Sequence, residues 1–217
     1  AAMRTLAKAD LVLALGCRFD FRMGAGKGIP KDAKVIQVHT DMRQIGFNLR
    51  ADIGIVGGAG PVASQLLEAV KSKRAEPADV PWTGAPKKRD ASSLPEPFQS
   101  KAIPCHPARC AGEVARFLEE EGRDWTLICD GGEASVWIQT VATAYRSGQI
   151  HATGANGTIG TGPGLAVGAW AANRKPVLLY TGDGSFGFYA MEMDTMARMG
   201  VPVVCVISND SAWGMIR

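Results

Sequence analysis

The chain of 217 residues has no apolar run that approaches the roughly 18 residues needed to cross a lipid bilayer, so we expect no membrane-spanning segment. It also has little excess of charge of either sign, because 24 Lys and Arg against 21 Asp and Glu give a net charge of +3. The basic residues are scattered rather than gathered in one patch. This balance is typical of proteins that do not bind nucleic acid.

Cysteine is scarce and its pattern indicates no disulfide framework. The five cysteines are an odd number at wide spacing, and the first residues carry no secretory signal pattern. These features predict a reduced, cytoplasmic protein. The one cluster of Cys and His, from Cys105 to Cys110, has no second ligand pair nearby, so it predicts the start of a helix rather than a zinc site.

The composition is that of a globular protein with an excess of glycine. Hydrophobic residues make up 46% of the chain and charged residues 21%, which is ordinary for a protein with a buried core. Glycine accounts for 26 residues, about 12% against the roughly 7% of average proteins. Many turns or close backbone approaches are therefore expected.

Strands and helices alternate in two segments, which predicts an α/β fold with two doubly wound parallel sheets. The first segment, 1–73, has expected strands at 11–15, 34–38 and 52–56 and a helix over about 61–73. Residues 74–104 contain six prolines and few periodic apolar positions, so they predict a linker. The second segment covers 105–217, and both segments start or stop abruptly, so we expect each to be a truncated domain.

The second segment has a longer series of expected elements. Helices are expected over about 107–120, from about 133, through about 172 and over about 187–199, and strands at 126–129, 176–182 and 201–208. A glycine-dense loop lies at 154–164.

Small and acidic residues follow two neighbouring strands of the second segment. Gly182-Asp183-Gly184 ends one strand and Asn209-Asp210 ends the next. Parallel strands bring such ends to one edge of the sheet, where glycines let an anionic group approach the backbone. Asp183 and Asp210 can then share a Mg²⁺ ion with a diphosphate. The alternative is that both segments are ordinary strand-end turns.

The stretch from Gly182 to Asp210 resembles the thiamine diphosphate binding motif, which opens with GDG and closes with a pair of Asn residues. ADLVLALGCRFD and KVIQVHTD, within residues 5–73, resemble the later part of the family's central, Rossmann-like domain. Residues 105–217 resemble the front half of its diphosphate-binding domain. The pattern is closest to acetolactate synthase-like carboligases and lyases, which include benzaldehyde lyase and 2-hydroxyacyl-CoA lyases.

The resemblance implies a set of cofactor contacts at this edge. The Mg²⁺ ligands would be Asp183, Asp210 and the backbone carbonyl of Ala212. The residues implied to line the diphosphate are Gly182, Gly184, Ser185, Trp213, Gly214 and Met215.

The remaining implied contacts lie on other loops. The Gly157 carbonyl would accept a hydrogen bond from the aminopyrimidine, and Ile159 would wedge the cofactor into its bent form. Gly131, Gly132 and Glu133 would run beside it. Asp210 departs from the family's usual Asn, and its extra negative charge would attract Mg²⁺ while repelling the diphosphate.

The implied reaction makes or breaks a carbon–carbon bond of a small 2-keto acid or 2-hydroxyacyl substrate. The resemblance also implies that the activating glutamate comes from an N-terminal domain of a neighbouring subunit, so a homodimer or homotetramer with the active site between subunits is expected. The 217 residues would therefore be inactive alone, with the catalytic residue outside them.

Two alternatives stay open from the sequence. The chain can be a non-catalytic thiamine diphosphate-binding fragment, which would bind the cofactor without turnover. It can also be a nucleotide-dependent oxidoreductase, because the glycines from Gly24 to Gly28 are followed after the next strand by Asp41, and some relatives hold FAD or an adenine nucleotide there. Against this, Ile29 stands where the third glycine of the nucleotide pattern would be.

Overall fold

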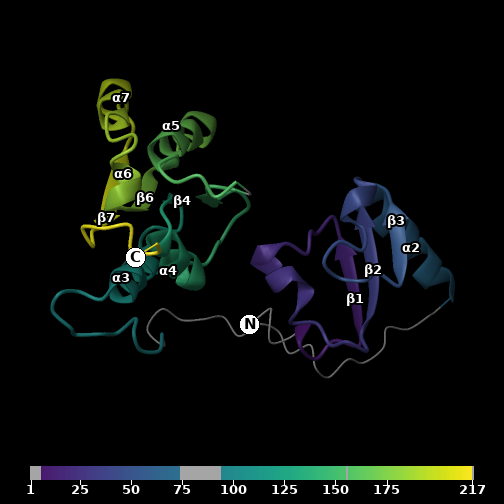
Figure 1. Cartoon of the computed structure of the whole chain (residues 1–217). Coiled ribbons are helices and arrows are strands. Elements are labelled where there is room, and N and C mark those ends of the chain that lie inside the picture. The colour runs from purple at the N-terminus through teal and green to yellow at the C-terminus, as the bar shows by residue number, and fades with distance from the viewer. Residues whose placement is uncertain (1–5, 74–93, 155, 217) are drawn as a thin grey trace. The chain divides into compact units, whose positions relative to one another are not determined.

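The structure is a computed structural model that describes residues 6–73, 94–154 and 156–216. The chain divides into two compact units, Ala1–Lys87 and Lys88–Arg217, and Figure 1 shows the elements of each. Each unit contains one parallel sheet, which confirms the predicted α/β fold class. Every helix in the described ranges is too short or too polar to cross a lipid bilayer.

The first unit contains three parallel strands in the order β1-β2-β3. The strands are β1 (Leu11–Leu15), β2 (Lys34–His39) and β3 (Ile53–Val56), and the helices are η1 (Phe21–Gly26), η2 (Met42–Gln44) and α2 (Ala59–Lys73). Val12, Ala14 and Val35 pack with Phe19 and Ile29 in a buried cluster on one face of the sheet. The β-branched runs therefore form strands where the sequence predicts them, and the two short 3₁₀ helices are additions.

The second unit contains four parallel strands in the order β5-β4-β6-β7. Its strands are β4 (Thr126–Cys129), β5 (Ile150–Ala152), β6 (Val177–Gly182) and β7 (Val203–Ser208). Its helices are α3 (Pro107–Glu120), α4 (Glu133–Val141), α5 (Gly162–Asn173), α6 (Asp183–Phe186) and α7 (Glu192–Met199).

Alternate residues of β4 and β6 face opposite helical layers of the second unit. Leu127 and Tyr180 pack in the cluster that contains α3 and α4, whereas Ile128 and Leu179 pack in the cluster that contains α5 and α7. In Figure 1 these two pairs of helices lie on opposite sides of the strands. This two-sided burial is why both strands read as continuous apolar runs in the sequence.

Two details of the second unit differ from the sequence prediction. The helix expected over 187–199 begins only at Glu192. Before it, the N–H groups of Phe188 and Tyr189 donate to carbonyls three residues earlier, which makes tight turns instead of a helix. The three-residue strand β5 was not expected, because it is too short to show a periodic pattern.

The segment 94–104, within the expected linker, contributes to the core of the second unit. It contains no helix or strand, but Leu94 and Phe98 are buried in the cluster around α3 and α4. The Phe98 ring also meets the Trp137 ring edge-on at 5.6 Å between centroids.

Candidate functional site

Four segments of the second unit follow the carboxyl ends of its strands or approach them. Residues 130–133 follow β4, 183–188 follow β6 and 209–215 follow β7, while the glycine loop 157–162 leads into α5. In open parallel sheets this edge is where ligands bind. The predicted site residues are on these four segments, apart from Gly182, which is the last residue of β6.

Asp130 joins two of these segments and was missed by the sequence analysis. It is fully buried, and its carboxylate oxygens accept the N–H groups of Gly160 at 3.0 Å and of Gly162 at 2.9 Å. A third N–H, from Gly131, lies 2.6 Å from Oδ1. Three donors to one carboxylate compensate for the loss of its hydration, and they fix the glycine loop to the end of β4. The sequence did carry a signal for this role: an acid directly follows a strand, and a glycine-dense loop elsewhere in the same segment has backbone N–H groups that need an acceptor.

Close packing of the glycines explains the residue type at several of these positions. Gly131 has φ +89°, and a Cβ there would lie 3.0 Å from the Gly182 nitrogen and 3.1 Å from Ser185 Oγ. A Cβ on Gly160 would lie 2.7 Å from Phe188 Cβ. The segment after β6 therefore packs closely against the segment after β4 and against the loop before α5. No side chain fits at Gly131 or Gly160, where these segments meet.

The paired strands β6 and β7 bring Asp183 and Asp210 to the same edge. Gly182 and Ser208 are register partners, and the two acids follow one and two residues later. Among the described residues, no group donates a hydrogen bond to the Asp183 carboxylate. Asp210 Oδ1 accepts the Ala212 N–H at 3.1 Å, which leaves Oδ2 directed elsewhere.

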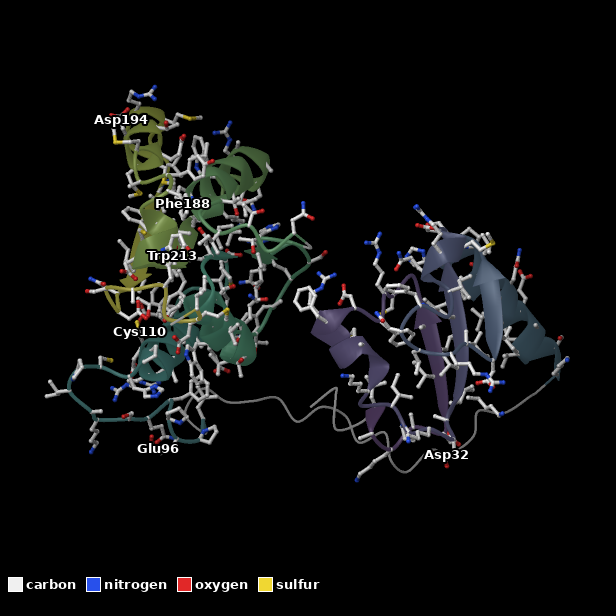
Figure 2. All side chains as sticks on the ribbon, in the orientation of Figure 1. Asp32, Glu96, Cys110, Phe188, Asp194 and Trp213 are labelled. Carbon is white, nitrogen blue, oxygen red and sulfur yellow. The ribbon has the colours of Figure 1, made fainter. Side chains whose placement is uncertain are left out.

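The segment after Asp210 folds back across Gly184 and Gly132. A Cβ on Gly214 would contact Asp210 Oδ2 and would lie 3.0 Å from Glu133 Oε2, so the two carboxylates face one point. The Trp213 ring lies against Gly184 and stacks on Phe188 at 5.9 Å between centroids. Figure 2 labels Phe188 and Trp213. Met215 Sδ lies 3.1 Å from the position of a Cβ on Gly132.

Glu133 is oriented by its own helix. Its Oε1 accepts the Trp137 indole N–H at 2.9 Å one turn along α4, and its Oε2 is directed toward Gly214. The structure therefore brings Glu133 together with Gly214 and Asp210. Ser185 is buried beside Gly131.

The loop before α5 holds the remaining predicted residues. Gly157 is exposed with φ +63°, and Ile159 is half-buried. Among the described residues, neither forms a hydrogen bond with Asp183 or Asp210, and Asp130 sets the position of their loop through Gly160 and Gly162.

The donors present at this edge fit a diphosphate held through a hard divalent cation. Asp183 and Asp210 supply carboxylate oxygens. Gly131, Gly184 and Gly214 are packed so closely against neighbouring atoms that a side chain would clash there, so only backbone lies at these positions. Among the described residues, no three His, Cys, Asp or Glu side chains form a metal site by themselves. A Mg²⁺ ion here would accordingly need phosphate oxygens and water among its ligands.

In the first unit the glycines at 24–28 form no extended nucleotide loop. Gly24 and Gly26 lie in the 3₁₀ turn η1, with φ +58° and +75°. The Asp41 carboxylate accepts the backbone N–H of Arg43 at 3.0 Å and pairs with its guanidinium at 2.9 Å. That pairing lowers the pKa of Asp41 to about 2 and accounts for an acid at this position.

The chain matches two domains of one protein family. Residues 130–217 match "Thiamine pyrophosphate enzyme, C-terminal TPP binding domain" and residues 1–66 match "Thiamine pyrophosphate enzyme, central domain".

Named relatives are similar along almost the whole chain. A probable acetolactate synthase of Mycobacterium bovis is 29% identical over 99% of this chain and 39% of its own length. A probable acetolactate synthase large subunit of Methanocaldococcus jannaschii is 30% identical over 100% of this chain and 37% of its own. A 2-hydroxyacyl-CoA lyase 2 of Caenorhabditis elegans is 27% identical over 97% and 34%. The chain thus spans a little over a third of the length of these curated relatives.

Proposed function

The chain belongs to the thiamine pyrophosphate enzyme family, and we propose that it is part of a Mg²⁺-dependent, acetolactate synthase-like enzyme that forms or breaks carbon–carbon bonds of 2-keto acids. One observation carries this proposal: Asp183 and Asp210 follow the paired ends of β6 and β7, at the edge of the sheet where the glycine-rich segments meet. It is supported by relatives named acetolactate synthase along almost the whole chain.

Within this proposal, Mg²⁺ is held by the carboxylates of Asp183 and Asp210 and by the backbone carbonyl of Ala212. The Asp183 carboxylate has no competing hydrogen bond among the described residues, and Asp210 Oδ2 is directed away from its own turn. When bound, thiamine diphosphate supplies the nucleophilic carbon and the electron sink that such reactions need.

The other residues position the cofactor. Gly182, Gly184 and Ser185 would face the diphosphate, and Trp213, Gly214 and Met215 would line it with backbone N–H groups. Gly131, Gly132 and Glu133 run beside it. The Gly157 carbonyl would accept a hydrogen bond from the aminopyrimidine, and Ile159 would wedge the cofactor into its bent form. Both residues lie on the loop that Asp130 anchors.

The complete active site needs a second subunit in this proposal. The activating glutamate comes from an N-terminal domain of a neighbouring chain in a homodimer or homotetramer. We therefore expect the 217 residues alone to bind the cofactor without turnover. Turnover by these residues without added protein would contradict this arrangement.

A second candidate is a C–C lyase acting on 2-hydroxyacyl-CoA substrates. The similarity to the 2-hydroxyacyl-CoA lyase 2 of Caenorhabditis elegans favours it. Because both candidates use the same cofactor site, the substrate separates them: consumption of pyruvate supports the first, and release of formyl-CoA from a 2-hydroxyacyl-CoA supports the second. In this proposal the activating glutamate lies outside the 217 residues, so these assays need a longer protein that includes the N-terminal domain.

The binding part of the proposal is tested on the chain itself. Calorimetric titration with thiamine diphosphate at saturating Mg²⁺ should show binding by the unaltered chain and a loss of at least tenfold in affinity for Asp183→Ala. Asp194→Ala is the matched control, because Asp194 is an exposed acid on α7 away from the strand ends. Equal affinity in the two variants would exclude Asp183 as a metal ligand.

A further inference from the structure

The N-terminus of α3 contains two cysteines that the proposed function does not use. His106 is the N-cap residue, and its Nδ1 accepts the Ala108 N–H at 3.1 Å. Cys105 is therefore the residue before the cap, and Cys110 is the fourth residue of the helix. These are the two positions whose side chains meet in the hydrophobic staple at helix N-termini. The helix start thus brings the two thiols toward one another.

Both cysteines line the same surface pocket of about 650 Å³. Cys105 is exposed and Cys110 is half-buried, and both are free thiols. Figure 2 places Cys110 on α3. The other polar lining comes from Ser100, Lys101, Arg109 and Glu113, of which Arg109 and Glu113 pair at 2.5 Å. Small oxidants can therefore reach the thiols without unfolding of the helix.

A buried hydroxyl lies in the core cluster against which Cys110 packs. Tyr180 on β6 is fully buried, and its Oη has no hydrogen bond of good geometry among the described residues. Burial raises the pKa of Tyr180, and the Cys110 and Cys105 thiols lie close enough to raise it further.

We propose that Cys105 and Cys110 are a redox modification site, which a low-molecular-weight disulfide such as oxidised glutathione converts into an intrachain disulfide. The exposed Cys105 sulfur attacks one sulfur of oxidised glutathione, and one reduced glutathione leaves. The Cys110 sulfur then attacks Cys105 Sγ, and the second reduced glutathione leaves. The two thiols lose two electrons and two protons, and one oxidised glutathione becomes two reduced molecules.

One of the four residues between the two cysteines, His106, is connected to the candidate site through the side chain of Trp137. The His106 ring meets the Trp137 ring edge-on at 5.7 Å between centroids, and Trp137 donates to Glu133 at 2.9 Å. A disulfide across the cap would tie down His106 in this series of contacts. The proposal itself concerns the modification and stands without the proposed function.

The sequence allows a direct test by peptide mapping. Trypsin cleaves after Lys101, Arg109 and Arg116, so the two cysteines fall in separate peptides, 102–109 and 110–116. The purified chain is equilibrated in glutathione buffers of increasing oxidised fraction, alkylated and digested. We expect the two peptides to be recovered mainly as one linked pair, 2 Da below their sum, which dithiothreitol separates. Cys105→Ser and Cys110→Ser should each lose the pair, and the control Cys17→Ser, in the other unit, should keep it.

A measurement on the unfolded chain shows whether the disulfide forms because of the folded structure or only because the two cysteines are five residues apart in the sequence. In 8 M urea we expect at least a tenfold higher ratio of oxidised to reduced glutathione to be needed for half-formation of the linked pair. An equal ratio in folded and unfolded chain would overturn the proposal. So would recovery of both peptides as separate glutathione adducts, or linked pairs that join ¹⁵N-labelled to unlabelled chains.

Discussion

The buried carboxylate of Asp130 holds the backbone N–H of Gly162 at 2.9 Å, 32 residues further along the chain. The same carboxylate accepts from Gly160, so it fixes the loop that carries Gly157 and Ile159. No side chain of the loop is needed for this. The geometry on the pyrimidine side of the proposed cofactor site therefore depends on an acid that does not face the cofactor.

Replacing Asp130 by Asn tests that dependence. The amide group can accept on only one atom, so one buried glycine N–H would face an NH₂ donor. We expect the free energy of unfolding to fall by roughly 2–4 kcal/mol. Hydrogen exchange should accelerate at Gly160 and Gly162. Asp124→Asn is the control, because 78% of the Asp124 side chain is exposed. Unchanged exchange in the loop of Asp130→Asn would contradict the anchoring role.

Two glycines of α5 should respond in opposite ways to alanine. A Cβ on Gly162 would lie 2.7 Å from Asp130 Cβ, Asp130 Oδ2 and Leu179 Cδ1, whereas a Cβ on Gly168 would meet nothing within 4 Å. We expect Gly162→Ala to destabilise the chain by roughly 1–3 kcal/mol. Gly168→Ala should stabilise it by up to about 1 kcal/mol, because alanine favours a helix. Urea denaturation measures both, and equal effects would mean that Gly162 is not tightly packed.

The chain should lose stability in alkaline solution through Cys129. Burial raises the pKa of its thiol to about 12, from an ordinary value of 9.0. Above pH 9 the unfolded chain releases this proton and the folded chain keeps it, so unfolding becomes more favourable up to about pH 12.

The expected loss from this thiol is roughly 4 kcal/mol across that range. Urea denaturation at a series of pH values gives the slope, which should be smaller in Cys129→Ala. Comparison of slopes rather than absolute stabilities removes the effect of the cavity. The same slope in both proteins would show that the Cys129 thiol does not resist ionisation.

Replacing Asp210 by Asn should change the Mg²⁺ dependence of cofactor binding. Asp210 Oδ2 and Glu133 Oε2 face one point near Gly214, so loss of one charge reduces both metal attraction and carboxylate repulsion. We expect thiamine diphosphate still to bind, with half-saturation at about two- to tenfold higher Mg²⁺. Titrations are followed by calorimetry, with Asp194→Asn as the control. Superimposed curves for wild type and Asp210→Asn would exclude this side chain as a ligand.

The sequence by itself determined most of the strands and longer helices, and the family. Buried parallel strands read as short β-branched runs, and Pro107 and its neighbours mark the start of α3, because these signals are local. The stretch from Gly182 to Asp210 predicted a thiamine diphosphate enzyme, and that prediction is confirmed. The individual cofactor and metal contacts stay predictions.

Only the tertiary structure decided which residues meet. Asp130 contacts residues 30 and 32 positions away, Glu133 and Asp210 converge on Gly214, and Trp213 stacks on Phe188. No periodicity encodes such contacts, because they depend on the order of strands in the sheet and on the path of the loops between them. The sequence places acids and glycines at strand ends, and the packing of those ends selects the partners of each one.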